Sequence, residues 1–263
     1  MIRRARPFLT LAMILLPATV DAADVTVRDL TSRPYHAERG NPLQLGGLDL
    51  RDLDLSGLDF KGATLAASNL FGSDLSRADL SKADLKGARL DRVTIIGTRF
   101  DGADLSDASF LRPSTFSTLA APVGEVASFA GADMRRARLF GRFNRTSFAG
   151  ADLSGAKLAP NSKTGFIEVL WRTEMMGADL SKANLSGADF SHTLLAFANL
   201  RGANLAGAVL RRADLSRADL TGADLTGVDL AEADLDGAIL TGTRGLDTAL
   251  GPATARNVAK AIR

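Results

Sequence analysis

Aspartate is the residue with chemical potential that recurs most regularly in this chain. It stands one position before a Leu or Phe in many five-residue units, for example at Asp79, Asp179 and Asp224. A carboxylate can act as a general acid or base when a cleft shifts its pKa. In this pattern each carboxylate takes the outward position of its unit, and a convex surface provides no cleft. We therefore expect no aspartate to be catalytic.

The other residue types that could do chemistry form no recognisable site. The chain has no Cys, and His36 and His192 are isolated, without convincing metal-ligating neighbours three or four residues away. The glycines follow the five-residue spacing and do not form the G-x-G-x-x-G pattern of a phosphate-binding loop. The sequence thus predicts no catalytic residue, no cofactor and no metal site, and a protein that is not an enzyme.

One basic cluster is suited to binding rather than catalysis. It contains Arg135, Arg136 and Arg138, followed by Arg142 and Arg145. Such a cluster could hold an anionic ligand, whether a glycan, a lipid head group or a nucleic acid. Ordinary surface charge is the alternative interpretation.

A second candidate for binding lies in an interruption of the repeat at residues 159–174. This stretch contains the single Trp, and its candidate partner-binding residues are Phe166, Trp171 and Arg172. Aromatic residues and Arg are enriched at binding hot spots. We interpret the stretch as a loop that projects from the folded repeat and contacts a protein partner. Packing of the loop against the repeat is the alternative.

The elements that would position these residues follow from the period of five. Leu or Phe occurs at every fifth position from Leu180 to Leu240, and Ala stands two residues earlier in eleven of those thirteen units. On an α-helix, five residues turn about 500°, so these residues would spiral around it without forming a face. On a strand, residues i and i−2 share a face. Small or polar residues such as Ser186 and Gly187 follow each Leu and suit a tight corner. The unit is therefore a three-residue strand and a corner, with the apolar pairs around one axis.

The units also resemble a known family. Ala178-Asp179-Leu180-Ser181-Lys182 and Ala223-Asp224-Leu225-Thr226-Gly227 are similar to the pentapeptide-repeat signature A-[DN]-L-x-x. The resemblance covers most of residues 43–243, with more than thirty tandem units. It implies an all-β fold, a right-handed quadrilateral parallel β-helix with four pentapeptides per coil. Eight or nine coils spaced about 4.8 Å apart would form a rod of roughly 40 Å.

The spacing is broken twice more before residue 159. Within residues 111–127 the pattern is lost, and nineteen residues separate Phe110 from Phe129. This stretch is either a degenerate coil or an excursion loop. One further residue is lost near Phe140 to Arg142. The predicted β-helix of residues 43–243 therefore has two interruptions, at 111–127 and at 159–174.

The N-terminus has the layout of a secretory signal peptide. Three arginines at positions 3, 4 and 6 precede an apolar stretch from Phe8 to Leu16, and Val20-Asp21-Ala22 suits cleavage. The apolar stretch is too short for a membrane span. We expect residues 1–22 to be removed near Ala22, a periplasmic or secreted location, and no membrane span. Residues 23–42 would form a lead-in or N-terminal cap.

The C-terminal segment, residues 244–263, is expected to close the open end of the stack. Gly251-Pro252 precedes Ala255, Val258 and Ile262, which recur at helical spacing. We predict a short helical cap over the last coil. A homodimer interface is the alternative, since the resemblance implies that C-terminal elements serve this role in some family members.

Charge separates the two leading functional hypotheses. Residues 23–263 contain 29 basic and 29 acidic side chains. The favoured hypothesis is an exported, non-catalytic scaffold that binds an unknown protein partner or has a structural role. The alternative, which the resemblance brings to mind, is a DNA mimic that binds a type II topoisomerase such as gyrase. A DNA mimic should be strongly acidic, so the zero net charge and the predicted export both argue against it and against a nucleic acid partner.

Overall fold

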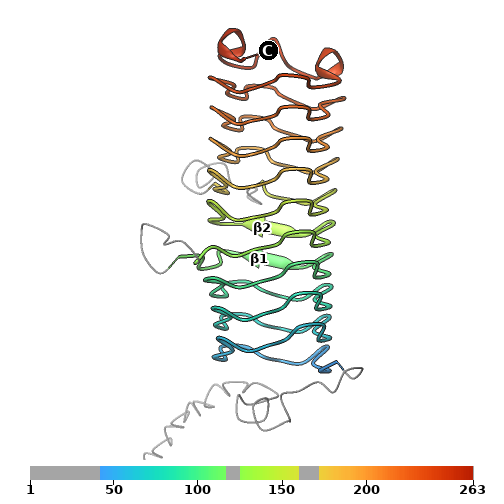
Figure 1. The fold of residues 1–263 in the computed structure, drawn as a ribbon, viewed down its shortest axis with the longest axis vertical. Coiled ribbons are helices and arrows are strands. Elements are labelled where there is room, and N and C mark those ends of the chain that lie inside the picture. The colour runs from blue at the N-terminus through green and yellow to red at the C-terminus, as the bar shows by residue number, and fades with distance from the viewer. Residues whose placement is uncertain (1–41, 117–124, 160–171, 263) are drawn as a thin grey trace, which may run out of the picture.

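The structure is a computed structural model that describes residues 42–116, 125–159 and 172–262. The predicted signal peptide and almost all of the N-terminal lead-in lie outside these ranges. The described chain winds as a stack of coils whose neighbours pair in parallel (Figure 1). Most pairings involve one residue per strand. Two longer strands, β1 (Ser109–Leu111) and β2 (Arg138–Phe140), pair in parallel with Phe110 opposite Leu139.

Each coil has four pairing positions, which define four faces of the rod. We number the faces by the columns of paired residues that begin at Gln44, Asp49, Asp54 and Asp59. In regular coils partners are twenty residues apart, as in Asp179 with Asn199, and in the coil that has lost one residue they are nineteen apart, as in Arg138 with Lys157. The column of face 1 has ten rungs in the described chain. Its members are Gln44, Thr64, Asp84, Asp104, Asp133, Asp152, Asn184, Asn204, Asp224 and Arg244. At about 4.8 Å per rung, the rod is about 43 Å long.

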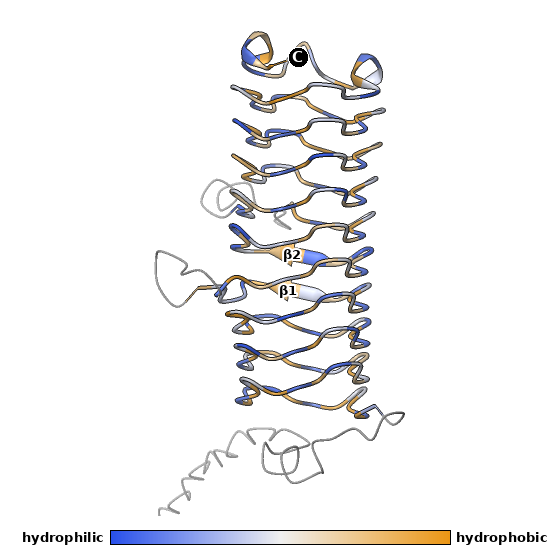
Figure 2. Cartoon of the chain, in the orientation of Figure 1, coloured by the Kyte–Doolittle hydropathy of each residue, from blue (hydrophilic) through white to orange (hydrophobic). Residues whose placement is uncertain are grey.

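The local unit matches the strand and corner that the sequence predicts. In the unit around Leu180, Ala178 and Leu180 are fully buried and Asp179 faces outward. The corner that follows closes with a hydrogen bond from the Ala183 N–H to the Leu180 carbonyl (3.1 Å). The last corner residue adopts a positive φ, which glycine reaches without steric cost. Hydrophobic and hydrophilic residues consequently alternate along every coil (Figure 2).

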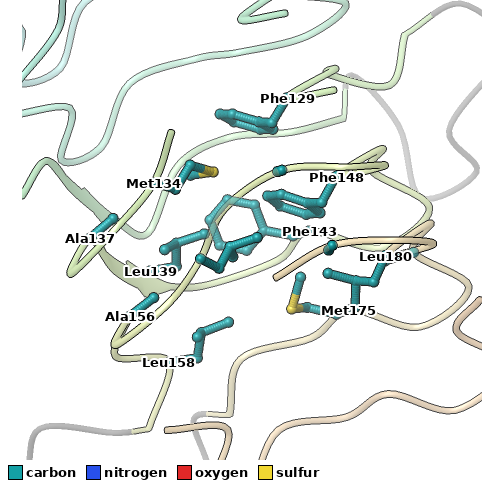
Figure 3. Close-up of a cluster of buried hydrophobic side chains, with 14 of the residues drawn as sticks. Phe129, Met134, Ala137, Leu139, Phe143, Phe148, Ala156, Leu158, Met175 and Leu180 are labelled. Carbon is teal, nitrogen blue, oxygen red and sulfur yellow. The ribbon is translucent and has the colours of Figure 1, made fainter. Parts of the chain in front are cut away.

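Leucines and alanines form a continuous core along the axis, and phenylalanines replace leucines near its middle. The ring of Phe129 is stacked between Phe100 (centroids 4.8 Å apart) and Phe148 (5.0 Å). Phe110 contacts the edges of this stack, at 5.5 Å from Phe129. Figure 3 shows Phe129, Phe143 and Phe148 together with the surrounding Leu and Met side chains. These residues lie where the five-residue spacing is irregular.

The flanks of the first interruption belong to the coil. Ser114 pairs with Thr94 on face 3, and Ser128 pairs with Arg99 on face 4. Phe129 therefore lies over Phe100, twenty-nine residues earlier, and Leu139 takes the place over Phe110. Residues 117–124 lie outside the described ranges. Within residues 111–127, the described residues on both sides of this gap therefore belong to the coils of the rod.

The predicted helical cap at residues 244–263 is not observed. In its place are two single 3-10 turns, η1 (Leu246–Thr248) and η2 (Val258–Lys260), within a further paired turn of chain. Leu250, Arg256 and Ile262 donate backbone hydrogen bonds to the last coil. Gly251 and Asn257 have positive φ values of 67° and 59°, which interrupt any helix across Ala255 and Val258. Pairing with the coil below satisfies backbone groups that a helix would leave unpaired.

Helix is therefore confined to these two turns in the described part of the chain, and the all-β prediction is confirmed. The right-handed winding stays a prediction. No helix in the described ranges has the length and apolar character needed to cross a membrane.

Candidate interaction surfaces

The repeated aspartates have a structural function at the corners. The Asp179 carboxylate accepts a hydrogen bond from the Ser181 backbone N–H (3.0 Å), and Asp224 accepts one from Thr226 (3.0 Å). Bonds from the Thr226 hydroxyl and N–H lower the pKa of Asp224 below its usual value. Asn199 accepts the equivalent bond from Arg201 (3.2 Å). Because a neutral amide performs the same task, the position needs an acceptor rather than an acid.

No group of three or more His, Asp or Glu side chains suited to a metal ion occurs among the described residues. His192 is at a corner between faces 2 and 3, half-buried, with a φ of 62°.

The predicted basic cluster does not form one patch. Arg135 and Arg136 occupy the corner between faces 1 and 2 and pair with Asp133 (2.5 Å) and Asp107 (2.7 Å). The hydrogen bond from Arg135 lowers the pKa of Asp133, and the bond from Arg136 lowers the pKa of Asp107. Both arginines are therefore held by carboxylates.

The remaining arginines of the cluster lie on different sides of the rod. Arg142 is on face 3, where its guanidinium is 3.5 Å from Glu174. Arg145 is at the corner between faces 3 and 4. Arg138 lies in β2 on face 2 and is exposed. Since consecutive residues run around the perimeter, a cluster in sequence is dispersed around the coil.

A different basic surface arises when coils stack. On face 2, Arg89 pairs with Ser109, Ser109 with Arg138, and Arg138 with Lys157. The corners on either side stack in the same way, so that the Asp107 N–H bonds the Arg135 carbonyl and the Arg92 N–H bonds the Leu111 carbonyl. We call the charged residues of face 2 and its two corners over these four coils the basic face. They are Lys86, Arg89, Asp91, Arg92, Asp107, Arg112, Arg135, Arg136, Arg138 and Lys157.

The predicted binding loop is described only at its ends. Phe166 and Trp171 lie outside the described residues. Arg172 is exposed, and Thr173 after it is fully buried. The Thr173 hydroxyl donates to the Leu158 carbonyl (2.7 Å), which returns the chain to face 3 beside the coil it left. The segment between Ala159 and Arg172 therefore begins and ends at one corner of the rod.

An exposed apolar surface, which we name the apolar corner, occurs where faces 3 and 4 meet. It consists of Met176 (38% exposed) and Phe197 (60% exposed), with Arg145 and Arg217 in the coils on either side. The Arg217 guanidinium lies 5.6 Å from the centre of the Phe197 ring. Phe197 has a φ of 62°, at a corner position that glycine occupies in about half of the described units. The sequence reasoning missed this site, although a Phe in the second corner position was a visible departure from the pattern.

Comparisons with known proteins agree with the observed architecture. The family model described as pentapeptide repeats matches in eight copies, over residues 44–81, 68–107, 173–212 and 203–242. A search of curated proteins found no match to this sequence.

Three solved structures illustrate the likeness. HetL, a pentapeptide repeat protein involved in heterocyst differentiation regulation from the cyanobacterium Nostoc, is 28% identical, with coverage of 88% of this chain and 99% of HetL (TM-score 0.40). QnrB1, a plasmid-mediated fluoroquinolone resistance protein, is 23% identical over 77% of this chain and 84% of its own (TM-score 0.36). A pentapeptide repeat protein of the Arabidopsis thaliana thylakoid lumen is 28% identical over 50% and 68% (TM-score 0.25).

Proposed function

Because this chain belongs to the pentapeptide-repeat family, we propose that it is an exported, non-catalytic scaffold that binds a protein partner at its apolar corner. Stacked repeats present long, rigid surfaces and suit this role. Fold alone does not define a function, so the proposal depends on a particular surface of this chain.

Phe197 is the observation that carries the proposal. A bulky residue with a positive φ is strained, by about 1–2 kcal/mol relative to the ordinary region, and Phe197 combines that strain with an exposed ring. The same backbone conformation recurs at corners such as Lys182 and Arg217, so the exposed ring is what distinguishes Phe197. Met176 extends the apolar surface, and Arg145 and Arg217 flank it. Aromatic residues and Arg are the types that contribute most to protein–protein binding.

Two further parts of the proposal, export and partner contacts from the loop, are based on the sequence. The layout of residues 1–22 supports secretion to the periplasm or the exterior. Phe166, Trp171 and Arg172 are proposed to add contacts for the same partner. The loop leaves and rejoins the rod at the corner between faces 2 and 3, which borders the face that leads to Met176.

The topoisomerase-binding alternative receives no comparable support. Corner cations separate the acidic positions of the faces, as where Arg201 pairs with Asp219 (2.9 Å) and Lys61 with Asp79 (3.2 Å). Among the described residues, the basic face carries a net charge whose sign is opposite to that of DNA.

A crosslinking experiment tests the apolar corner. A photoreactive phenylalanine analogue at position 197 keeps the ring and should crosslink to one envelope protein. The same analogue at position 182, a corner with the same backbone conformation between faces 4 and 1, should not. Phe197→Gly should abolish capture of that protein while changing stability by less than about 1 kcal/mol. Equal crosslinking from both positions would refute the assignment of this corner.

Cell fractionation with N-terminal sequencing tests export separately. The expected result is a periplasmic or secreted protein that begins after Ala22. An uncleaved cytoplasmic protein would refute export and restore the topoisomerase hypothesis.

A further inference from the structure

We propose that the basic face binds a linear anionic polysaccharide, which lies along the rod axis. The surface is separate from the apolar corner and does not depend on the protein partner proposed above. Its eight cations and two carboxylates give a net charge of +6 over four coils. A surface with such an excess attracts anions by long-range electrostatics.

The centre of the basic face is a pair of stacked cations. Arg138 in β2 is directly in register with Lys157 of the next coil. Neighbouring strands are about 4.8 Å apart, and like charges directly opposite each other destabilise a sheet. Neither side chain has an ion pair or side-chain hydrogen bond among the described residues, and neither belongs to a corner. The two cations therefore make no ion pair or side-chain hydrogen bond among the described residues that would stabilise the fold.

In other columns of the rod, charged residues in register either have opposite signs or have hydrogen-bond partners. Asp224 is in register with Arg244 and pairs with it (3.2 Å), and Asp234 pairs likewise with Arg256 (3.3 Å). The stacked carboxylates of face 1 each accept a corner N–H, as Asp152 does from Ser154 (2.9 Å). Like-charge stacking there has a structural explanation. At Arg138 and Lys157 that explanation is missing, and an external anion would supply the missing partner.

The shape of the surface selects among anionic ligands. The basic face is bordered by the carboxylate column of face 1, in which Asp84, Asp104, Asp133 and Asp152 follow one another. A ligand wide enough to span both faces, such as a membrane or a nucleic acid duplex, would meet this repulsive column. A single extended chain fits the strip between the corners. The sugar-to-sugar rise of an extended glycan is close to the spacing of stacked strands, so successive carboxylates or sulfates can meet successive coils.

The distribution of exposed apolar residues also argues against a membrane or a single-stranded nucleic acid as the ligand. The exposed large apolar side chains in the described ranges are Met176, Phe197, Leu250 and Ile262, and none is on the basic face. Membrane-surface binding uses buried apolar groups as well as charge. Single-stranded nucleic acid sites add aromatic platforms for the bases. The ring of Phe71 is covered by Arg89 at 4.6 Å and Arg92 at 5.5 Å, and Phe140, at the corner that follows Arg138, is only partly exposed.

The test measures binding of fluorescently labelled polygalacturonate fragments to the protein that comprises residues 23–263. The double variant Arg138→Ser, Lys157→Ser should weaken binding at least about ten-fold, which corresponds to about 1.4 kcal/mol. Its melting temperature should be unchanged or higher, because a like-charge contact is removed. The matched control Lys82→Ser, Lys182→Ser removes two cations from the corner between faces 4 and 1 and should change the affinity less than about two-fold.

Three results would overturn the proposal. Wild-type protein that does not bind polygalacturonate at physiological salt contradicts it directly. Equal losses in the two double variants mean that net charge, not the basic face, determines binding. Tighter binding of an oligo-dT strand or of phosphatidylglycerol vesicles identifies a nucleic acid or membrane site instead. Phe197→Gly should bind the glycan normally, so failure here and failure of the protein-binding proposal are distinguishable.

Discussion

Replacing Phe129 with Leu tests how the core is held together where the repeat is irregular. Leu is the usual residue at this position, so the backbone can stay unchanged. The Phe129 ring lies nearly parallel to Phe100 (3° between planes) and Phe148 (6°), and all three rings are fully buried. An aromatic pair contributes about 0.5–1.5 kcal/mol beyond its buried area. The Phe129 ring also contacts Phe110 edge-on (5.5 Å), so loss of three pairs should destabilise the protein by about 1.5–4.5 kcal/mol.

A matched variant separates stacking from loss of volume. Phe60 occupies the same position on face 4 in the first described coil, is buried, and makes no ring contact among the described residues. Phe60→Leu should therefore destabilise less than Phe129→Leu. Guanidinium unfolding followed by circular dichroism gives the free energies. Hydrogen exchange reports the coils around Phe129, because a solenoid need not unfold in one step.

A double-mutant cycle of Phe100→Leu and Phe129→Leu measures the stacking energy itself. The expected coupling is about 0.5–1.5 kcal/mol. A coupling within about 0.3 kcal/mol of zero, the additivity of independent sites, would refute the reasoning. So would an equal loss of stability in Phe60→Leu and Phe129→Leu.

Four further predictions follow from the same geometry. Ala218→Leu should overpack a filled coil and reduce stability by about 1–3 kcal/mol, whereas Lys182→Ser should change it by less than about 0.5 kcal/mol; equal shifts in melting temperature would contradict the assignment of inside and outside positions. Hydrogen bonds lower the pKa of corner carboxylates such as Asp224 in the folded protein, so stability present above about pH 4 should fall as the pH drops through the folded pKa values. Replacing Asp54, Asp133 and Asp224 together by Asn should make the melting temperature less sensitive to pH between 6 and 3, and an unchanged profile would contradict this. Deleting residues 251–263 should expose the last coil and cause association or fraying in light scattering, although a stable monomer produced from a full-length dimer would show that the segment is a dimer interface. Trp171→Ala should weaken partner capture with little change in melting, and a stability loss of about 3–5 kcal/mol would mean that the loop is packed in a core.

The sequence was sufficient to predict the wall of the rod. The identical pairs, such as Ala178 and Leu180, all need the same apolar environment, and only a closed coil provides it for every unit. The five-residue unit also predicted that the aspartates face outward, and Asp179 does so between the buried Ala178 and Leu180. The corner hydrogen bonds that they make were not foreseen, since they depend on the geometry of the corner rather than on spacing.

Positions beyond the interruptions could not be predicted from spacing alone. Counting from Phe110 places Phe129 almost one coil later on the same face, whereas the insertion places it over Phe100 on another face. For the same reason, the spacing in the sequence could not show that Arg138 aligns with Lys157. The C-terminal helix was mispredicted for another reason. Its apolar spacing was helical, but Gly251 and Asn257 turn the chain back so that its backbone can pair with the last coil.

The pairing offsets also determine which changes of length a gene for this rod can tolerate. Partners on face 1 are 20 residues apart in regular coils, 29 between Asp104 and Asp133, 19 between Asp133 and Asp152, and 32 between Asp152 and Asn184. Residues added between two pairing positions leave every later side chain on its original face. Loss of a single pentapeptide would instead rotate all later units by a quarter turn and exchange their faces. Descendants of such a gene should therefore differ by whole coils or by small insertions or deletions at corners, and deletions of a single pentapeptide should be rare among them.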